Sequence, residues 1–225
     1  MRCIIDKRAD NEIIEYFKKL GYKCILLDKQ DKVYAEISSH PDVFFVNIND
    51  NIFKSKSIQN IDINAINVNT LGLNISIDIL SKTAILNRKY TDKDILKYLE
   101  ENNYRIINVK QRYASCSILN LGNNCIVTAD KGIYKSALEN EIEVFLLDEK
   151  DLDIKLYDEN NNFSNMKGFI GGATKVIDNK VIFFGDIKYI KNFTKLKEYI
   201  NSKGYEIVYF KDKNLIDLGS VITKR

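Results

Sequence analysis

The stretch Gly21-Tyr22-Lys23-Cys24-Ile25-Leu26-Leu27 decides how the chain is organised, because its pattern returns three more times. It follows an amphipathic segment at residues 11–20 and has the apolar character of a buried strand. Apolar runs of the same kind end three later units, at residues 103–109, 142–147 and 204–210. A weak internal repeat of this kind indicates one supersecondary unit that is used several times.

The spacing of these runs predicts a fifth copy. The equivalent positions Tyr22 and Tyr104 are about two unit lengths apart, at about 45 residues per unit. A less regular unit is therefore expected within residues 28–82, and this unit contains His40. Its middle, residues 57–72, is rich in Asn and Ile and has no clear period, so the sequence indicates neither helix nor strand there.

Each unit also has an apolar strand before the pattern just described, joined to the next strand by a turn. Asn, Asp and Gly occupy these turns and suit tight hairpins. The predicted first strands are residues 43–47, 74–79, 117–120 and 174–177. The chain ends split the fifth hairpin, so residues 218–222 are expected to pair with residues 3–5 and to leave no exposed sheet edge.

These patterns predict an α/β fold of five strand-strand-helix-strand units, closed through the termini into a ring. We expect a single domain over residues 1–225, because no separate second domain can be recognised. The polar, Asn-rich residues 151–167 are expected to be an inserted loop.

Charge and composition exclude several classes of protein. The net charge is +3 and basic and acidic residues are interleaved, so no basic face indicates a nucleic-acid partner. Charges follow Met1 closely and no run approaches a membrane span, so we expect a soluble cytoplasmic protein without a membrane partner. One His and four Cys without a Cys-x-x-Cys pair favour neither a metal site nor disulfides, and we expect no cofactor.

Two segments carry the candidate chemistry. His40 is the only histidine, it precedes the only proline, and Asp42 follows; its pKa makes it the first candidate for proton transfer at neutral pH. The alternative is that His40 only ends a strand and Asp42 only caps a turn. Cys116 starts a strand-like run between two serines, whereas the other cysteines lie inside apolar runs typical of a core. Cys116 is thus either a nucleophile or one more buried thiol.

The predicted ring brings distant residues together. His40, Cys116, Gly171-Gly172 and residues 217–220 all occupy the start of the first strand in their units. Equivalent positions of a closed cyclic repeat meet at one end of its axis, where propellers often bind ligands. Gly171 and Gly172 are therefore candidates for the site, with a purely backbone role as the alternative.

Four segments resemble motifs of the pentein fold, the five-bladed α/β-propeller of the guanidine-modifying superfamily. His40-Pro41-Asp42-Val43-Phe44-Phe45 is similar to its His-x-Asp-x-x-Phe segment, and residues 115–119 are similar to the strand that bears its cysteine. Residues 217–221 resemble its acidic Gly-Gly-Asp segment, and residues 7–10 resemble its Lys-Arg-Thr-Asn segment. The motifs keep the family's cyclic order but begin elsewhere, so the chain resembles a circular permutation of arginine deiminase and dimethylarginine dimethylaminohydrolase.

The resemblance implies a hydrolase of guanidines or amidines that forms a covalent thiouronium-type intermediate. It implies that Cys116 is the nucleophile, that His40 is the general acid and base, and that Asp42 grips the guanidinium. Asp217 would assist Asp42, and Arg8 would hold a substrate carboxylate. A solvated charge near a helix start is the alternative for Arg8.

The chain departs from the family's pattern at two places. Ser220 stands where the family has a second acid, so we expect it to assist substrate binding as a hydroxyl. Ala173, after the paired glycines, also replaces an acid that related enzymes often carry. These losses favour a second hypothesis, in which the chain is a catalytically inactive pentein that binds a ligand or a partner.

Overall fold

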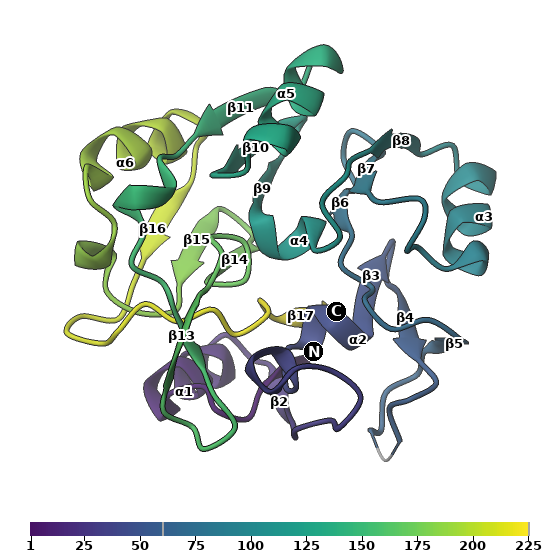
Figure 1. Ribbon diagram of the computed structural model, residues 1–225, viewed down its shortest axis with the longest axis horizontal. Helices are drawn as coiled ribbons and strands as arrows, with labels where there is room; N and C mark the ends of the chain where they lie inside the picture. Colours follow the sequence, from purple (N-terminus) through teal and green to yellow (C-terminus); the bar gives the residue numbers. More distant parts are fainter. Residues whose placement is uncertain (60, 225) are drawn as a thin grey trace.

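The computed structural model is a mixed α/β structure, of which residues 1–59 and 61–224 are described. These residues form six separate sheets, five with three strands and one with two. The sheets lie around a common centre, and none of them closes on itself (Figure 1). In each three-stranded sheet the middle strand pairs antiparallel with one neighbour and parallel with the other.

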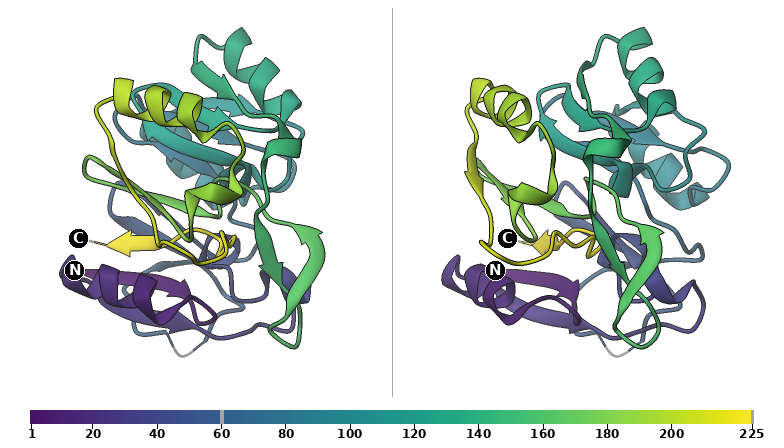
Figure 2. Two further views of the ribbon diagram at one scale, coloured as in Figure 1. Left: turned by 90° about the vertical axis from the view of Figure 1, so that its left-hand side faces the viewer. Right: turned by 60° about the vertical axis from the view of Figure 1, so that its left-hand side comes forward.

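One of these sheets joins the two ends of the chain. It consists of β17 (Ile222–Lys224), β1 (Arg2–Asp6) and β2 (Lys23–Leu27). Ile4 lies opposite Ile222 in the antiparallel pair, and the termini lie side by side (Figure 2). The predicted pairing of the ends is therefore confirmed, but the last strand begins later than predicted. Gly219 and Ser220 have φ values of 63° and 56°, and this turn keeps the preceding residues out of the strand.

The other four sheets repeat this plan. Their strands are β3 (Phe45–Ile48), β4 (Asn51–Ser55) and β5 (Ile66–Val68); β6 (Ser76–Asp78), β7 (Thr83–Leu86) and β8 (Arg105–Asn108); β9 (Ile118–Gly122), β10 (Cys125–Thr128) and β11 (Glu143–Leu146); β14 (Thr174–Ile177), β15 (Lys180–Phe183) and β16 (Glu206–Val208). In three of these four sheets the turn between first and second strands contains Asn or Asp at positive φ, such as Asn49 and Asn123, as the sequence predicts, whereas Lys82 has the positive φ in the β6–β7 turn.

Helices follow the second strand in four of the five units. They are α1 (Asn11–Lys19), α3 (Lys93–Glu101), α5 (Lys131–Glu139) and α6 (Phe193–Ser202). Asp10, Asp92 and Asp130 cap the first three, each accepting a backbone N–H bond in the first turn. The irregular unit, whose middle the sequence left undecided between helix and strand, has no helix among its described residues between β4 and β5 and so departs from the plan of the other four.

Two one-turn helices precede first strands, where the sequence predicted strand. They are α2 (Pro41–Phe44) before β3 and α4 (Ala114–Ser117) before β9. Proline suits the first helical position because its missing N–H needs no partner there. Val43 and Ser117 therefore belong to helical turns, and both candidate catalytic segments lie at these turns. Residues 1–59 and 61–224 also contain three short 3₁₀ turns: η1 (Ala35–Ile37), η2 (Glu149–Asp151) and η3 (Ile187–Tyr189).

The predicted inserted loop contains a hairpin instead. Strands β12 (Lys155–Tyr157) and β13 (Phe163–Lys167) pair antiparallel, and the rings of Tyr157 and Phe163 stack with centroids 5.8 Å apart. Ser164 Oγ donates a hydrogen bond of 3.0 Å to Glu36 in η1. The hairpin is thereby fixed to the segment that leads into His40.

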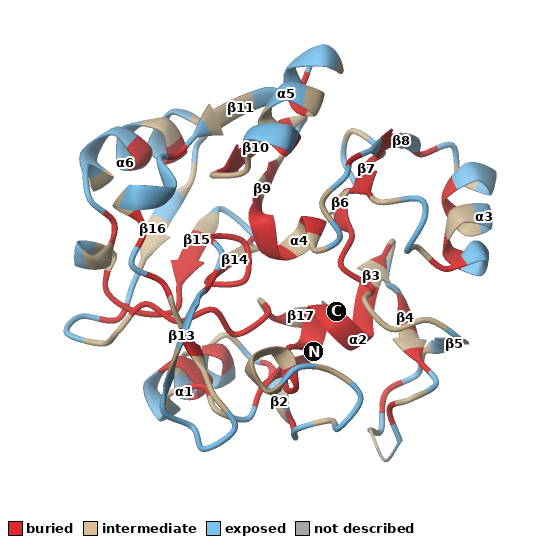
Figure 3. Cartoon of the chain, in the orientation of Figure 1, coloured by how far each residue is buried: buried red, intermediate tan, exposed pale blue. Residues whose placement is uncertain are grey.

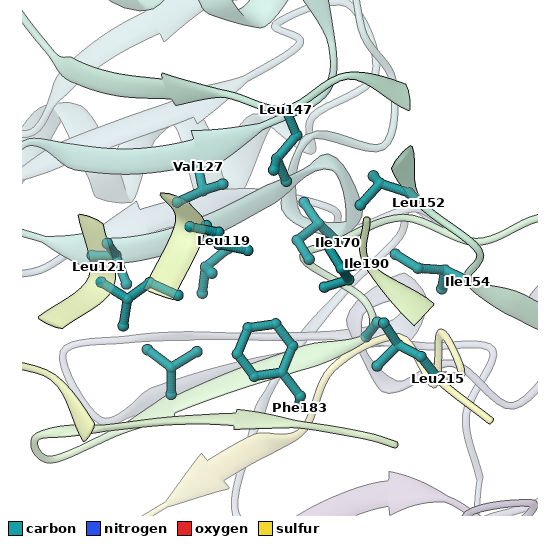
Figure 4. Close-up of a cluster of buried hydrophobic side chains, with 14 of the residues drawn as sticks. Leu119, Leu121, Val127, Leu147, Leu152, Ile154, Ile170, Phe183, Ile190 and Leu215 are labelled. Carbon is teal, nitrogen blue, oxygen red and sulfur yellow. The ribbon is translucent and has the colours of Figure 1, made fainter. Parts of the chain in front are cut away.

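The hydrophobic core is divided among neighbouring sheets rather than gathered in one layer. Phe183 of β15 packs with Leu119 and Val127 of the adjacent sheet (Figure 4). Burial is greatest near the common centre, around α2 and α4, while the outer helices expose one face (Figure 3). The helices are short, so this packing rather than helix propensity stabilises them. No helix within residues 1–59 and 61–224 is long and apolar enough to cross a membrane.

Candidate functional site

A cavity of about 530 Å³ lies at the common centre of the sheets. The first strand of each three-stranded sheet contributes to its lining: Asn47 of β3, Ser76 of β6, Asn120 of β9, Val176 of β14 and Thr223 of β17. Asp42, Ser115, Gly171 and Ser220 also line it. All four segments that the sequence placed at one end of the axis therefore reach this cavity, although His40, Cys116 and Asp217 lie behind its lining.

Cys116 contacts the carboxylate of Asp42 directly. Its Sγ donates to Asp42 Oδ2 at 2.8 Å, and Ser115 Oγ donates to the same oxygen at 2.9 Å. Asn74 Nδ2 donates to Cys116 Sγ at 3.4 Å. Cys116 and Asp42 are each 3% exposed, so these contacts form in a nearly dry environment.

Asn74 is a residue that the sequence reasoning missed. It lies two residues before the first strand of its unit, β6, as Cys116 lies two residues before β9, and it is 2% exposed. The ring argument alone would have found it, because its position is equivalent to those of the other candidates.

Gly171 and Gly172 hold the cysteine segment against the acidic segment. Gly172 N donates to Cys116 O at 3.0 Å, while Gly172 O accepts bonds from the N–H groups of Leu218 and Ser220. A Cβ on Gly172 would lie 1.9 Å from Asp217 Oδ1. Only glycine therefore permits this approach of the chain segments. Gly171 lines the cavity as well, but the contacts of both glycines are those of backbone packing.

His40 is completely buried between two carboxylates. Its Nδ1 lies 3.7 Å from Asp217 Oδ1 and its Nε2 lies 3.9 Å from Asp6 Oδ2. Asp217 itself accepts backbone N–H bonds from Phe169 and Gly219, both at 2.9 Å. A Cβ on Gly219 would lie 2.3 Å from His40 Cβ, so a glycine at positive φ is needed beside the imidazole.

Arg8 lies beside this group but outside the lining of the central cavity. Its guanidinium binds Asp6 through Nε and Nη2, at 3.0 and 2.7 Å, and donates to the backbone oxygens of Ala35, Glu36 and Tyr157. Asp6 is fully buried, and the sequence reasoning missed it. Its position at the end of a strand, before the Lys-Arg pair, was the available signal.

Burial shifts the protonation equilibria of the site toward neutral forms. It raises the pKa of the Cys116 thiol well above the usual range, and the carboxylates of Asp42 and Asp217 raise it further. Burial also raises the pKa values of Asp42 and Asp217. It lowers the pKa of His40, although Asp217 and Asp6 oppose this effect. At neutral pH the thiol therefore keeps its proton and the imidazole is uncharged.

Several buried polar atoms of the site have no hydrogen-bond partner among the described residues. They are both ring nitrogens of His40, Oδ1 of Asp42 and Oδ1 of Asn74. Folded proteins pair nearly all such atoms, so their concentration here points to a place for a bound polar group. Among the described residues no cluster of three or more His, Cys, Asp or Glu side chains could hold a metal ion.

A second hollow, of about 450 Å³, lies on the loops that precede the one-turn helices. Val43, Gly72, Arg112 and Tyr113 are among its lining residues. The Arg112 guanidinium stacks on the rings of Tyr90 and Tyr113, at 4.9 and 5.6 Å from their centroids. Arg112 is four positions before Cys116, so the second hollow lies next to the loop that leads into the cysteine segment.

We expect Asp42→Asn to stabilise the fold at neutral pH. A carboxyl whose pKa is raised on folding binds its proton more tightly in the native state, so stability falls as pH rises through that raised pKa. Between pH 5 and pH 7.5 the melting temperature of Asp42→Asn should rise relative to that of the wild type by about 2–4 °C. Thermal unfolding at a series of pH values measures this difference.

Asp78→Asn is the matched control for that measurement. Asp78 is also buried, but it accepts bonds from Leu80 N, Ser81 N, Ser81 Oγ and Asn124 N. An amide would replace some of these acceptors by a donor, so this variant should lose stability. A pH-independent loss of stability in Asp42→Asn would contradict the assigned pKa direction.

Solved structures with similar folds include a DDAH, an agmatine deiminase and a domain of ArgZ. A mutant of DDAH from Pseudomonas aeruginosa in complex with citrulline has a TM-score of 0.58 at 10% identity, over 93% of this chain and 91% of that chain. Agmatine deiminase from C. jejuni with substrate bound has a TM-score of 0.57 at 11% identity, over 96% and 80% of the two chains. The N-terminal domain of ArgZ, covalently bound to a reaction intermediate, has a TM-score of 0.54 at 10% identity, over 95% and 91%.

These likenesses define the class of the fold. The chain has the fold of the pentein, or guanidine-modifying, superfamily, so the resemblance stated from the sequence is confirmed at that level. Within that class, the chain belongs to a family of unknown function (DUF6873), whose model matches residues 4–222. No curated protein matches the sequence significantly.

Proposed function

We propose that this protein is a guanidine- or amidine-modifying hydrolase in which Cys116 is the nucleophile and His40 the general acid and base. The five three-stranded sheets would be the blades of one pentein domain, closed through β1 and β17. The observation that carries the proposal is the contact between Cys116 Sγ and Asp42 where Asp42 borders the central cavity. It joins a potential nucleophile to a potential cation-binding group.

Asp42 would bind the substrate cation, with Asp217 adding charge from the other side. Asp42 Oδ1 is buried without a donor, and a planar amidinium presents N–H groups that suit such an oxygen. Ser220 lines the same cavity, although its hydroxyl donates to Thr174 O. Gly171 and Gly172 would hold the backbone of the site. Small guanidine-type ligands are consistent with the complexes of similar fold.

The chemistry would begin with the thiol proton. A cation beside Asp42 offsets the negative charge that keeps the pKa of Cys116 high, so the thiol can transfer its proton to His40. The Sγ then forms a bond to the central carbon of the guanidinium. The imidazolium of His40, flanked by Asp6 and Asp217, gives its proton to the leaving amine as the C–N bond breaks.

Hydrolysis of the thiouronium-type intermediate would complete the cycle. His40, now neutral, accepts a proton from a water molecule as the oxygen bonds to the carbon. The C–S bond breaks, the urea-type product leaves, and the sulfur recovers a proton from His40. These steps require neither a metal nor an organic cofactor. In the observed conformation Arg8 would position Asp6; holding a substrate carboxylate would require it to leave Asp6.

Covalent labelling tests the proposal. We expect 2-chloroacetamidine, a cation, to alkylate Cys116 with saturation kinetics, while the neutral analogue 2-chloroacetamide reacts at least about tenfold more slowly after both rates are normalised to a free thiol. Peptide mass spectrometry locates the adduct. Alkylguanidines should protect Cys116, and His40→Ala should slow its labelling. Labelling of Cys116 only after unfolding would overturn the proposal.

A binding function without catalysis is the second candidate. It is favoured by the raised pKa of Cys116, since burial and the carboxylates of Asp42 and Asp217 all favour the neutral thiol. Such a protein would bind guanidines reversibly in the cavity without forming a bond to sulfur. Calorimetry showing saturable binding of an alkylguanidine, together with an unreactive Cys116, would support this alternative.

A further inference from the structure

Two cysteines lie side by side in the sheet that joins the chain ends. Cys3 of β1 is directly opposite Cys24 of β2 in the parallel pair, and their sulfur atoms are 3.4 Å apart. Both thiols are free, and the sulfurs of Cys116 and Cys125 contact side-chain oxygens instead. Cys3 and Cys24 are thus the pair of cysteines placed to be oxidised together within one molecule.

The backbone places these two residues at the separation that a disulfide requires. Neighbouring strands lie about 4.8 Å apart, which is within the range of Cα separations that disulfides span. Both sulfurs lie on the face of the sheet that α1 covers, where Cys24 Sγ approaches Ile14 O at 3.8 Å. Rotation of the two side chains therefore brings the sulfurs within bonding distance without a change in the pairing of β1 with β2.

The two thiols differ in their access to solvent. Cys3 is completely buried, whereas Cys24 is partly exposed. Burial raises the pKa of the Cys3 thiol and the Cys24 sulfur raises it further, while the charge of Lys175 acts in the opposite direction. A reagent must reach the sulfur, and the thiolate is the reactive form, so Cys24 is the thiol that reacts first. Cys3 is then placed to react with a group already attached to Cys24.

We propose that Cys3 and Cys24 form a second reactive site, separate from Cys116, which exchanges with a small-molecule disulfide such as oxidised glutathione. The Cys24 sulfur attacks one sulfur of the small molecule, which leaves as a thiol with the Cys24 proton, and a mixed disulfide remains on Cys24. The Cys3 sulfur then attacks the Cys24 sulfur, and its proton passes to the second departing thiolate. The two cysteines lose two electrons and two protons, and the small disulfide becomes two thiols.

The new bond joins β1 and β2 where the chain ends are held together. Strand β1 also pairs with β17, and Asp6 at its other end lies beside His40 and binds Arg8. Cys3 and Cys24 are 21 positions apart, so a disulfide between them restricts the unfolded chain. The oxidised protein should therefore resist unfolding more strongly than the reduced protein, and this inference does not depend on the proposed function.

Incubation of the folded wild-type protein with oxidised glutathione tests the inference. The protein is then unfolded in N-ethylmaleimide, which blocks the remaining thiols, and digested without reduction. Peptide mass spectrometry should find the peptides of Cys3 and Cys24 joined, at a mass lower by two hydrogen atoms than the sum of the separate peptides. The melting temperature should rise by about 5–10 °C on oxidation and return after treatment with dithiothreitol.

Single variants test the order of the two steps. In Cys3→Ala, Cys24 should stop at the mixed disulfide with glutathione, whereas in Cys24→Ala the buried Cys3 should react at least about tenfold more slowly. Cys125→Ala is the control and should form the Cys3–Cys24 bond at the wild-type rate, because its sulfur lies in a different core cluster. Recovery of Cys3 and Cys24 as free thiols, a mixed disulfide that persists on Cys24 in the wild type, or joining of the two residues only after unfolding would each overturn the inference and leave the proposed function intact.

Discussion

Replacing Cys116 by alanine is expected to reduce the hydrolysis of any guanidine or amidine that the wild type turns over by at least about 1,000-fold, because the covalent route is lost. Release of the urea-type product, followed with a colorimetric ureido assay, measures the effect. Binding should persist, since Asp42 and the cavity lining remain. The loss should therefore appear in kcat rather than in the affinity for the substrate.

Cys125→Ala is the matched control for this experiment. Cys125 is also buried, and its Sγ contacts Tyr199 Oη at 3.0 Å, in the core between neighbouring sheets. The Cys125→Ala variant should therefore be less stable than the wild type, while its turnover per folded molecule should be unchanged. If Cys116→Ala retained more than a few per cent of the wild-type rate, the thiol would not be the nucleophile and a binding function would be favoured.

The repeat made much of the fold accessible from the sequence. Apolar runs such as residues 174–177, together with the Asn and Asp turns, predicted strands that the structure contains. The pairing of the chain ends followed from the same count of units. A circular permutation relative to known penteins stays a prediction. Local pattern failed at Val43 and Ser117, because a single helical turn of apolar or small residues has no period of its own.

The candidate site was less accessible than the fold. His40, Asp42, Asp217 and Cys116 were identifiable because they match motifs in cyclic order. Asp6 and Asn74 were not, because their roles depend on contacts across units: Asp6 meets His40, and Asn74 meets Cys116. The pairing of Arg8 with Asp6 depends likewise on where η1 and the β12–β13 hairpin place their backbone oxygens.

Gly171 shows how closely the backbone of the site is packed. A Cβ at this position would lie 2.2 Å from Ser115 O, 2.4 Å from Ile118 O and 2.7 Å from Cys116 O. These oxygens belong to α4 and to the first residue of β9, so they cannot rotate away as a side chain could. The conformation of Gly171 is not in the positive-φ region, so the requirement for glycine here is one of space alone.

Gly171→Ala is therefore expected to destabilise the fold by about 3 kcal/mol and to lower the melting temperature by about 10 °C. Because α4 must shift to admit the methyl group, labelling of Cys116 by chloroacetamidine should also slow in molecules that remain folded. Gly204→Ala is the matched control: its φ is +83° but nothing lies within 4 Å of the added Cβ, so only about 1 kcal/mol of backbone strain is expected. Calorimetric unfolding of the two variants compares their losses of stability. Equal losses in Gly171→Ala and Gly204→Ala would mean that the segment at Gly171 adapts to an added side chain and does not fix the position of Cys116.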